Sequence, residues 1–252
     1  VADDLFCSAF AKQYGEWCEK HGIILTGHIL HEDSLTVQSE LSGSMMRFYE
    51  YMGYPGIDNL SAHNGCYWAA IQCASVARQM GKKFVLSELY GCTGWDMPLS
   101  EYKRIGDWHV LFGVNLRCPH LSWYSMKGEA KRDYPASILS QNSWYRDWKP
   151  LEDHFARVGM IMTEGTRKCD LLVIHPVENM WLRVHKGCVD GLSPAEEQVA
   201  HAHHAPGVVA QQVLHPPGKV DLPPAHKPPP DEVPAVVPPV DVQVKGQGLR
   251  AE

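Results

Sequence analysis

The sequence has no cluster of lysine and arginine, no glycine loop for nucleotides and no long apolar run. Its 252 residues carry a formal net charge of −6, which excludes the usual nucleic-acid binders because these gather basic residues against phosphates. No GxGxxG or Walker pattern follows a predicted strand. No apolar run reaches the roughly 18 residues of a membrane span, and no signal peptide opens the chain. We therefore expect a cytoplasmic protein with no nucleic-acid or membrane partner.

Cysteine patterns typical of zinc sites are also lacking. None of the eight cysteines forms a CxxC pair, so we expect buried free thiols in a reducing compartment. The histidines of HAHHAP (201–206) and the group His28, His31 and Glu32 offer metal ligands, but neither segment fixes a complete ligand set. The sequence therefore predicts neither a metal nor another cofactor.

Aromatic residues end at Trp181, and proline dominates from about residue 193. Such a stretch cannot bury enough apolar surface to offset its ordering entropy. We predict three parts. Residues 1–148 form a barrel-like catalytic region, residues 149–192 begin a second α/β unit, and residues 193–252 are a disordered, proline-rich tail.

Helical and strand patterns alternate before the tail. Apolar periodicity predicts helices over 4–21, 40–52, 66–80, 98–112 and 150–165. Apolar runs predict strands over 23–28, 54–60, 83–88, 114–118 and 169–176. The first four strands begin about 30 residues apart, which is the period of βαβ units with parallel strands. The predicted fold class is α/β, with a partial (β/α) TIM-barrel-like sheet favoured over a doubly wound one.

Polar and aromatic side chains gather where the predicted strands end, which is where parallel α/β folds place their sites. Carboxylates and amides suit sugar hydroxyls, and aromatic faces suit the apolar side of a sugar ring. Glu88 is the predicted catalytic carboxylate, because a carboxylate closing an apolar strand is costly unless it is used or paired. The alternative is a glutamate satisfied by arginine or backbone donors. The predicted substrate-binding residues are His28, Asp58, Asn59, Tyr90, Trp95, His120 and Trp123.

The segment FVLSELYGCTGWDM (84–97) resembles the end of the seventh strand in retaining-clan barrel glycosidases. There, Ser-Glu or Thr-Glu precedes a Tyr-Gly or similar pair. WCEKHGIILTGHILHED (17–33) and YPGIDNLSA (54–62) resemble the fifth and sixth strand ends of such enzymes. Residues 153–181 resemble the start of the α/β domain that follows the barrel. Over residues 10–181 the chain is similar to barrel glycoside hydrolases, both bacterial α-L-rhamnosidase-like enzymes and related β-glycosidases.

This resemblance implies hydrolysis of plant-type oligosaccharides or aryl glycosides by two carboxyl groups, with a small carbohydrate as substrate. It implies that Glu88 is catalytic, that His28 and Asp58 contact substrate, and that His120 and Trp123 line the sugar pocket. Retaining and inverting enzymes differ in the separation of the two carboxyl groups, which the sequence does not give.

Only four barrel-like strands precede the second unit, whereas a full barrel takes about 250 residues. The half that carries the acid/base on strand four lies outside the resemblance. We predict Glu32 as its substitute because it follows a strand end directly, with Asp33 and Asp58 next; a solvated loop acid is the alternative reading of Glu32. The exposed edges of a half barrel predict a homo-oligomer. Other readings of the chain are a non-catalytic carbohydrate-binding fragment and, less favoured, a flavodoxin-like protein.

Overall fold

The computed structural model describes most of the chain up to residue 183. The described residues are 1–30, 32, 34–59, 66–125, 127, 128, 138, 140–167 and 173–183, with two short strands at 210–211 and 242–243. The predicted tail, 193–252, therefore lies outside the described residues except for these two strands. The predicted strand over 169–176 is described only from residue 173.

A parallel sheet of four strands lies at the centre of the described chain, in the order β1-β2-β3-β4. Its strands are β1 (Thr26–Gly27), β2 (Tyr54–Asn59), β3 (Leu86–Leu89) and β4 (Leu116–Pro119). All three pairings are parallel, as the spacing of the predicted strands requires. Two further pairs are β5 (Thr166–Arg167) with β8 (Val242–Gln243), antiparallel, and β6 (Val173–Ile174) with β7 (Ala210–Gln211), parallel. Closure of the sheet into a barrel stays a prediction.

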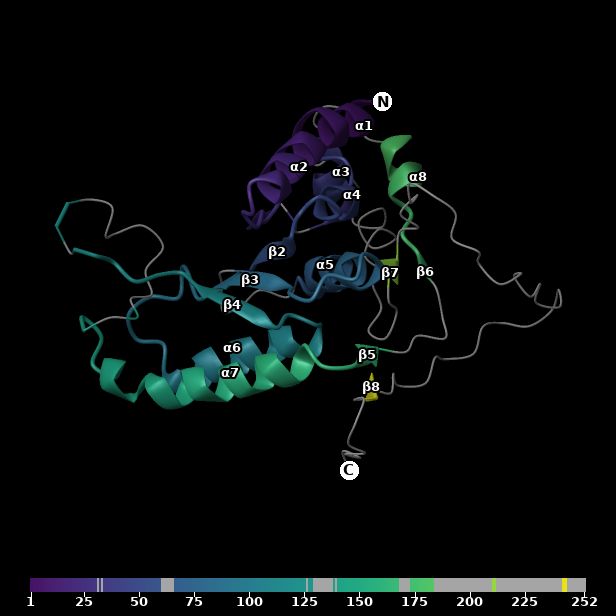
Figure 1. Ribbon diagram of the computed structural model, residues 1–252. Coiled ribbons are helices and arrows are strands. Elements are labelled where there is room, and N and C mark those ends of the chain that lie inside the picture. Colours follow the sequence, from purple (N-terminus) through teal and green to yellow (C-terminus); the bar gives the residue numbers. More distant parts are fainter. Residues whose placement is uncertain are drawn as a thin grey trace, which may run out of the picture.

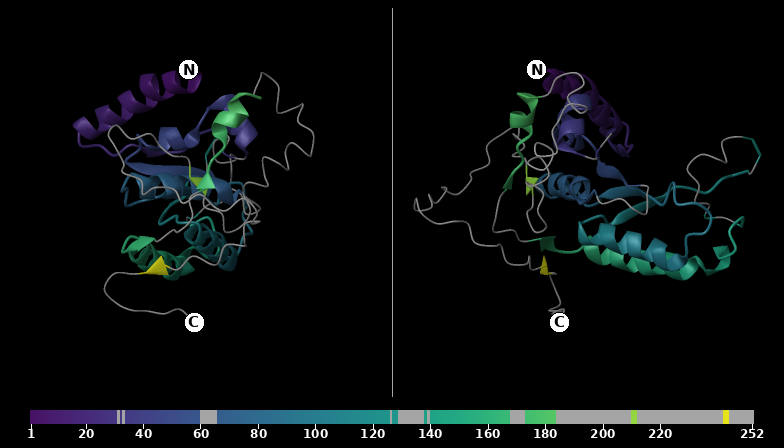
Figure 2. Two further views of the ribbon diagram at one scale, coloured as in Figure 1. Left: turned by 90° about the vertical axis from the view of Figure 1, so that its right-hand side faces the viewer. Right: turned by 180° about the vertical axis from the view of Figure 1, so that it is seen from behind.

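Helices lie on both sides of this sheet, with α1 to α4 on one side and α6 and α7 on the other (Figures 1 and 2). The N-terminal helix comprises α1 (Ala2–Phe6), a π-helical segment (Cys7–Lys12) and α2 (Gln13–Lys20). The other helices are α3 (Leu35–Leu41), α4 (Met45–Tyr49), α5 (Tyr67–Gln79), α6 (Leu99–Leu111), the 3-10 turn Tyr145–Asp147, α7 (Lys149–Met162) and α8 (Val177–Trp181). No helix in the described part of the chain is both long and apolar enough to cross a membrane.

The single helix predicted over 40–52 is wrong, because two helices meet there. Helix α3 begins five residues earlier than that prediction, after Ser34, whose side chain accepts a hydrogen bond from the Val37 amide. The chain then turns at Gly43, where φ is +79°, a conformation that favours glycine. Ser44 caps α4 by accepting from the Arg47 amide. Both helix starts carry the serine cap that is typical of helix N-termini.

Side chains alternate between the two faces of β2 and β3, as strand geometry requires. Ile57 and Leu89 are fully buried and belong to the two hydrophobic clusters that the helices form with the sheet. Asp58 and Glu88 lie on the opposite face and are partly exposed. The alternation therefore sends the apolar residues into the core and leaves one carboxylate from each strand on the accessible face.

Helix α7, predicted to open a second unit, packs against α6. A Cβ atom at Gly106 of α6 would lie 2.2 Å from Phe155 Cζ of α7, so the two helices approach more closely than a larger residue would allow. Phe155 and Leu151 share a hydrophobic cluster with Leu89 of β3. The helix therefore belongs to the same core as the sheet, and the three-part division of the chain stays a prediction.

Apolar side chains lie beside β1 and β4, the two outer strands of the sheet. Among the described strands, β1 and β4 each have a neighbour on one side only. Beside β1, Ile23 and Ile24 are about half exposed. Beside β4, a groove of about 430 Å³ lies between the start of the strand and α7, with Leu116 and Phe155 in its lining.

We expect the chain to self-associate through these edges, because an uncovered strand edge is a pairing template. Ile24→Lys should shift the protein toward monomer, since a charge on an edge opposes pairing. Leu111→Lys, at a 76 % exposed position on α6, is the matched control and should leave the mass unchanged. Sedimentation velocity over a range of concentrations measures both variants. A wild-type protein that is monomeric at every concentration would show the prediction to be wrong.

Candidate functional site

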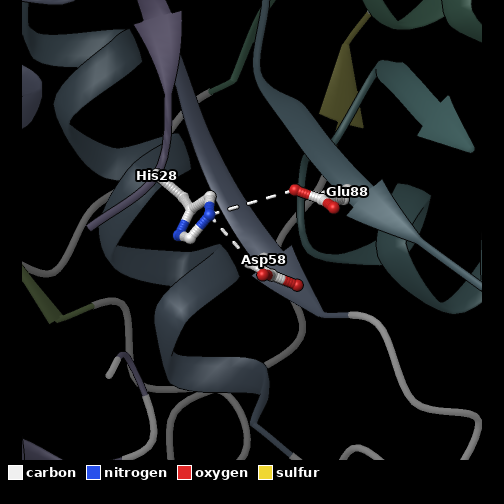
Figure 3. A group of neighbouring side chains, drawn as sticks. All are labelled: His28, Asp58 and Glu88. Carbon is white, nitrogen blue, oxygen red and sulfur yellow. Dashed lines mark ion pairs between the residues drawn. The ribbon is translucent and has the colours of Figure 1, made fainter. Parts of the chain in front are cut away.

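Three ionisable side chains meet at the carboxyl ends of the first three strands (Figure 3). His28 Nε2 lies 3.5 Å from an Asp58 carboxylate oxygen and 3.9 Å from a Glu88 carboxylate oxygen. These distances lie within ion-pair range and beyond an ordinary hydrogen bond. One ligand atom from each of the three residues lies within 4.8 Å of the others.

The sheet register explains this convergence. Asp58 and Glu88 are direct partners in the β2–β3 pairing, so their side chains project from the same face of adjacent strands. His28 follows β1 directly, and His120 follows β4. His120 Nε2 lies 3.7 Å from the second Glu88 oxygen. The four predicted strand-end residues are therefore brought together around Glu88, with an imidazole beside each of its two oxygens.

The group is accessible to a small molecule. The exposed fractions of the side chains are 34 % for His28, 26 % for Asp58 and 27 % for Glu88. The His28 imidazole lies within ion-pair range of both carboxylates. One imidazole nitrogen and two carboxylate oxygens at this spacing also form a donor set that suits a divalent cation.

Glu32 lies outside this group, although the sequence predicts it as the catalytic acid. Its side chain is only 5 % exposed. Its carboxylate accepts hydrogen bonds of 2.7 Å from the Tyr49 hydroxyl and from the Asp58 backbone amide. Burial raises the pKa of Glu32 to about 8, and the nearby Asp58 charge adds to this rise, whereas hydrogen bonds from the Asp58 amide, the Tyr49 hydroxyl and the Ile29 amide oppose it.

Two predicted substrate-binding residues also face away from the group. Asn59 is 1 % exposed, because it follows Asp58 and so points to the opposite face of β2. Tyr90 is fully buried, and its hydroxyl accepts a hydrogen bond from Arg117 at 2.8 Å. Burial raises the pKa of Tyr90. Neither side chain is placed beside Glu88.

The predicted aromatic residues Trp95 and Trp123 form a pair. Their ring centroids lie 5.1 Å apart at an angle of 41°. Trp95 comes from the loop after β3 and Trp123 from the loop after β4, so the pair joins the two loops that follow Glu88 and His120. Trp95 is 41 % exposed, whereas Trp123 is 7 % exposed, which makes Trp95 the accessible face of the pair.

Two thiols at the site, Cys92 and Cys118, are exposed, although the sequence predicts buried cysteines. Cys118 is exposed and pairs directly with Glu88 in the β3–β4 register. Burial and the Glu88 charge raise the pKa of Cys118, and burial and the Asp58 charge raise that of Cys92. Strand pairing could have predicted the place of Cys118. Asp58, Glu88 and Cys118 are partners on three adjacent strands, so their side chains form a row across one face of the sheet.

The fold is similar to that of part of a solved enzyme structure. Comparison with known protein families gives no match, and comparison with curated protein sequences gives none. A rhamnosidase from Novosphingobium sp. PP1Y superposes with a TM-score of 0.59 at 19 % sequence identity, over 68 % of this chain and 17 % of that one. The described chain thus has the α/β fold of part of a known glycoside hydrolase, and it spans a small share of that protein's length.

Proposed function

We propose that the chain carries a glycoside hydrolase site in which Glu88 is the nucleophile or base. The observation that carries the proposal is the meeting of two partly exposed carboxylates, Asp58 and Glu88, at the carboxyl ends of adjacent parallel strands. Sites in parallel α/β folds lie at these ends, and glycosidic cleavage needs two carboxyl groups. The fold shared with part of a rhamnosidase supports the same reaction class.

Asp58 is the second carboxyl group of this proposal, in place of Glu32. In the first step the protonated Asp58 gives its proton to the glycosidic oxygen, which leaves with the electrons of the broken bond. The Glu88 carboxylate attacks the anomeric carbon and forms a glycosyl ester. Water, deprotonated by Asp58, then hydrolyses that ester. His28 and His120 lie beside the two Glu88 oxygens, within ion-pair range.

The carboxyl separation favours retention of configuration. The closest oxygens of Asp58 and Glu88 lie within 4.8 Å. Retaining enzymes place their carboxyl groups about 5–5.5 Å apart, whereas inverting enzymes need about 6.5–9.5 Å to admit a water molecule. We therefore expect the first-formed sugar to have the anomeric configuration of the substrate.

Hydrolysis of a panel of α- and β-linked chromogenic glycosides, α-L-rhamnosides included, tests the reaction class. Plant-type oligosaccharides and aryl glycosides are the proposed substrates, and Trp95 is the proposed platform for an aryl or sugar ring. Proton NMR of the product in the first minutes reads the anomeric outcome. A panel that the wild-type protein leaves uncleaved would contradict the proposed activity, and an inverted product would contradict the retaining mechanism.

A carbohydrate-binding fragment without catalysis is the second candidate. It is favoured by one observation: the chain matches only 17 % of the rhamnosidase, so most of that protein has no counterpart in the match. Sugar-induced quenching of tryptophan fluorescence, without release of any product, would support this candidate over the hydrolase.

A further inference from the structure

Glu32 makes two contacts that connect a buried carboxyl group to the candidate site. One carboxylate oxygen accepts from the backbone amide of Asp58 at 2.7 Å, and the other accepts from the Tyr49 hydroxyl at 2.7 Å. Tyr49 is fully buried in the core between α4 and the sheet. Glu32 therefore joins a rigid core position to the backbone of a site residue.

The Asp58 amide donates this hydrogen bond at a level of β2 where β1 is no longer paired with it. Strand β1 pairs with β2 only at Tyr54 and Pro55, so its ladder stops before Asp58. On the other side, β3 pairs with β2 as far as Asn59. At Asp58, the Glu32 carboxylate therefore accepts the amide hydrogen that a carbonyl of β1 would accept if that strand were longer.

Three hydrogen bonds to its carbonyl oxygen hold the Glu32 backbone in place. Its carbonyl oxygen accepts from Gln38 Nε2 at 3.2 Å, from Trp68 Nε1 at 3.2 Å and from Cys66 Sγ at 3.3 Å. Gln38 belongs to α3, and Trp68 to α5. Contacts to two helices fix the Glu32 backbone, so its side chain has little freedom to swing into the site.

We propose that Glu32 is a positioning residue that fixes Asp58 beside His28 and Glu88 by accepting the Asp58 amide hydrogen, and that it is not the proton donor. This inference rests on the proposed function for its kinetic consequence, although the positioning itself does not depend on any activity. It replaces the expectation from the sequence that Glu32 acts as the catalytic acid.

The Glu32→Gln substitution distinguishes a positioning role of Glu32 from a role as proton donor. A glutamine side chain keeps an oxygen that accepts from the Asp58 amide, but it cannot act as an acid. If Glu32 positions Asp58, Glu32→Gln keeps kcat within a few-fold of wild type, whereas Glu32→Ala lowers it by about 100-fold, since a misplacement of about 1 Å has this effect. If Glu32 donates the proton, both variants lose activity equally.

The experiment combines kinetics with NMR of the full 252-residue chain. The amide proton of Asp58 and the ring protons of His28 report the contact without any turnover. We expect Glu32→Gln to leave the His28 ring signals at their wild-type positions. Glu32→Ala should move them toward their positions in Asp58→Ala and should make the Asp58 amide exchange faster with solvent.

Glu50→Ala is the control for loss of a buried carboxyl group. Burial raises the pKa of Glu50 to about 7, and Glu50 caps the C-terminal end of α4, where its charged neighbours are Arg47, Lys82 and Asp3. It should leave the Asp58 and His28 signals unchanged. Unchanged signals in a folded Glu32→Ala variant would overturn the proposal, and so would equal losses of kcat in Glu32→Gln and Glu32→Ala. A wild-type chain without glycosidase activity, but with the expected NMR changes, would refute the proposed function and keep the positioning role.

Discussion

Glu88→Gln is expected to lower kcat/KM for glycoside hydrolysis by about 1,000-fold or more. The substitution preserves the size of the side chain but removes the carboxylate that attacks the anomeric carbon or activates water, a contribution of about 10² to 10⁴-fold for general acid or base chemistry alone. The other carboxylate of the site, Asp58, already serves as the acid in the proposed mechanism, so it does not replace Glu88. Initial rates on the best chromogenic glycoside of the panel measure the loss.

Glu164→Gln serves as the matched control, because Glu164 is 63 % exposed and lies 4.0 Å from Lys83, away from the strand ends. It should keep wild-type rates. Azide distinguishes the role of Glu88 further. If Glu88 is the nucleophile, azide added to Glu88→Ala attacks the substrate directly and gives a glycosyl azide of inverted configuration. Full activity in Glu88→Gln would place the catalytic carboxylate elsewhere.

The sequence predicted the candidate site best where strand geometry alone decides it. The ends of parallel strands lie at one edge of a sheet, so naming the residues at four strand ends was enough to bring His28, Asp58, Glu88 and His120 into one place. The same rule failed for Asn59. Neighbouring residues on a strand point to opposite faces, so Asp58 and Asn59 could not both reach the site, and the alternation in the sequence already contained this information.

The positions of Tyr90 and Glu32 depend on features that sequence patterns do not reveal. Tyr90 has a φ of +78°, a left-handed conformation that is rare outside glycine, and this turn takes its ring from the site into the core. Glu32 is buried under α3, a helix whose start the apolar periodicity missed. Its environment, and therefore its raised pKa, results from tertiary packing of α3, α4 and α5 around one loop residue.

Arg117→Ala is expected to lower the free energy of unfolding by about 2 kcal/mol, because it removes two hydrogen bonds of a buried guanidinium and its packing on an aromatic ring. The Arg117 side chain is 8 % exposed and donates to Glu152 at 2.8 Å. It also donates to the Tyr90 hydroxyl at 2.8 Å, and its Cζ atom lies 3.9 Å from the centre of the Phe155 ring. The substitution removes these bonds and the packing of the guanidinium on the ring.

Arg104→Ala provides a close comparison, since Arg104 also donates to a glutamate, Glu101, at 2.8 Å. Its side chain is 55 % exposed, and exposed pairs contribute about 0–1 kcal/mol. Urea unfolding of both variants, with equal slopes, measures the difference. A loss below about 1 kcal/mol for Arg117→Ala would mean that Glu152, which is 43 % exposed, leaves the pair well solvated.

Arg117 also contacts Tyr90, a residue close in sequence to the candidate catalytic Glu88. Tyr90 lies two residues after Glu88, and its hydroxyl is held by Arg117 between β4 and α7. Arg117→Lys keeps the charge but cannot form two hydrogen bonds in the same plane. It should therefore recover only part of the lost stability. If it also lowers kcat without changing KM, the contact transmits its effect to Glu88, whereas unchanged kinetics in a destabilised Arg117→Lys variant would confine Arg117 to the core.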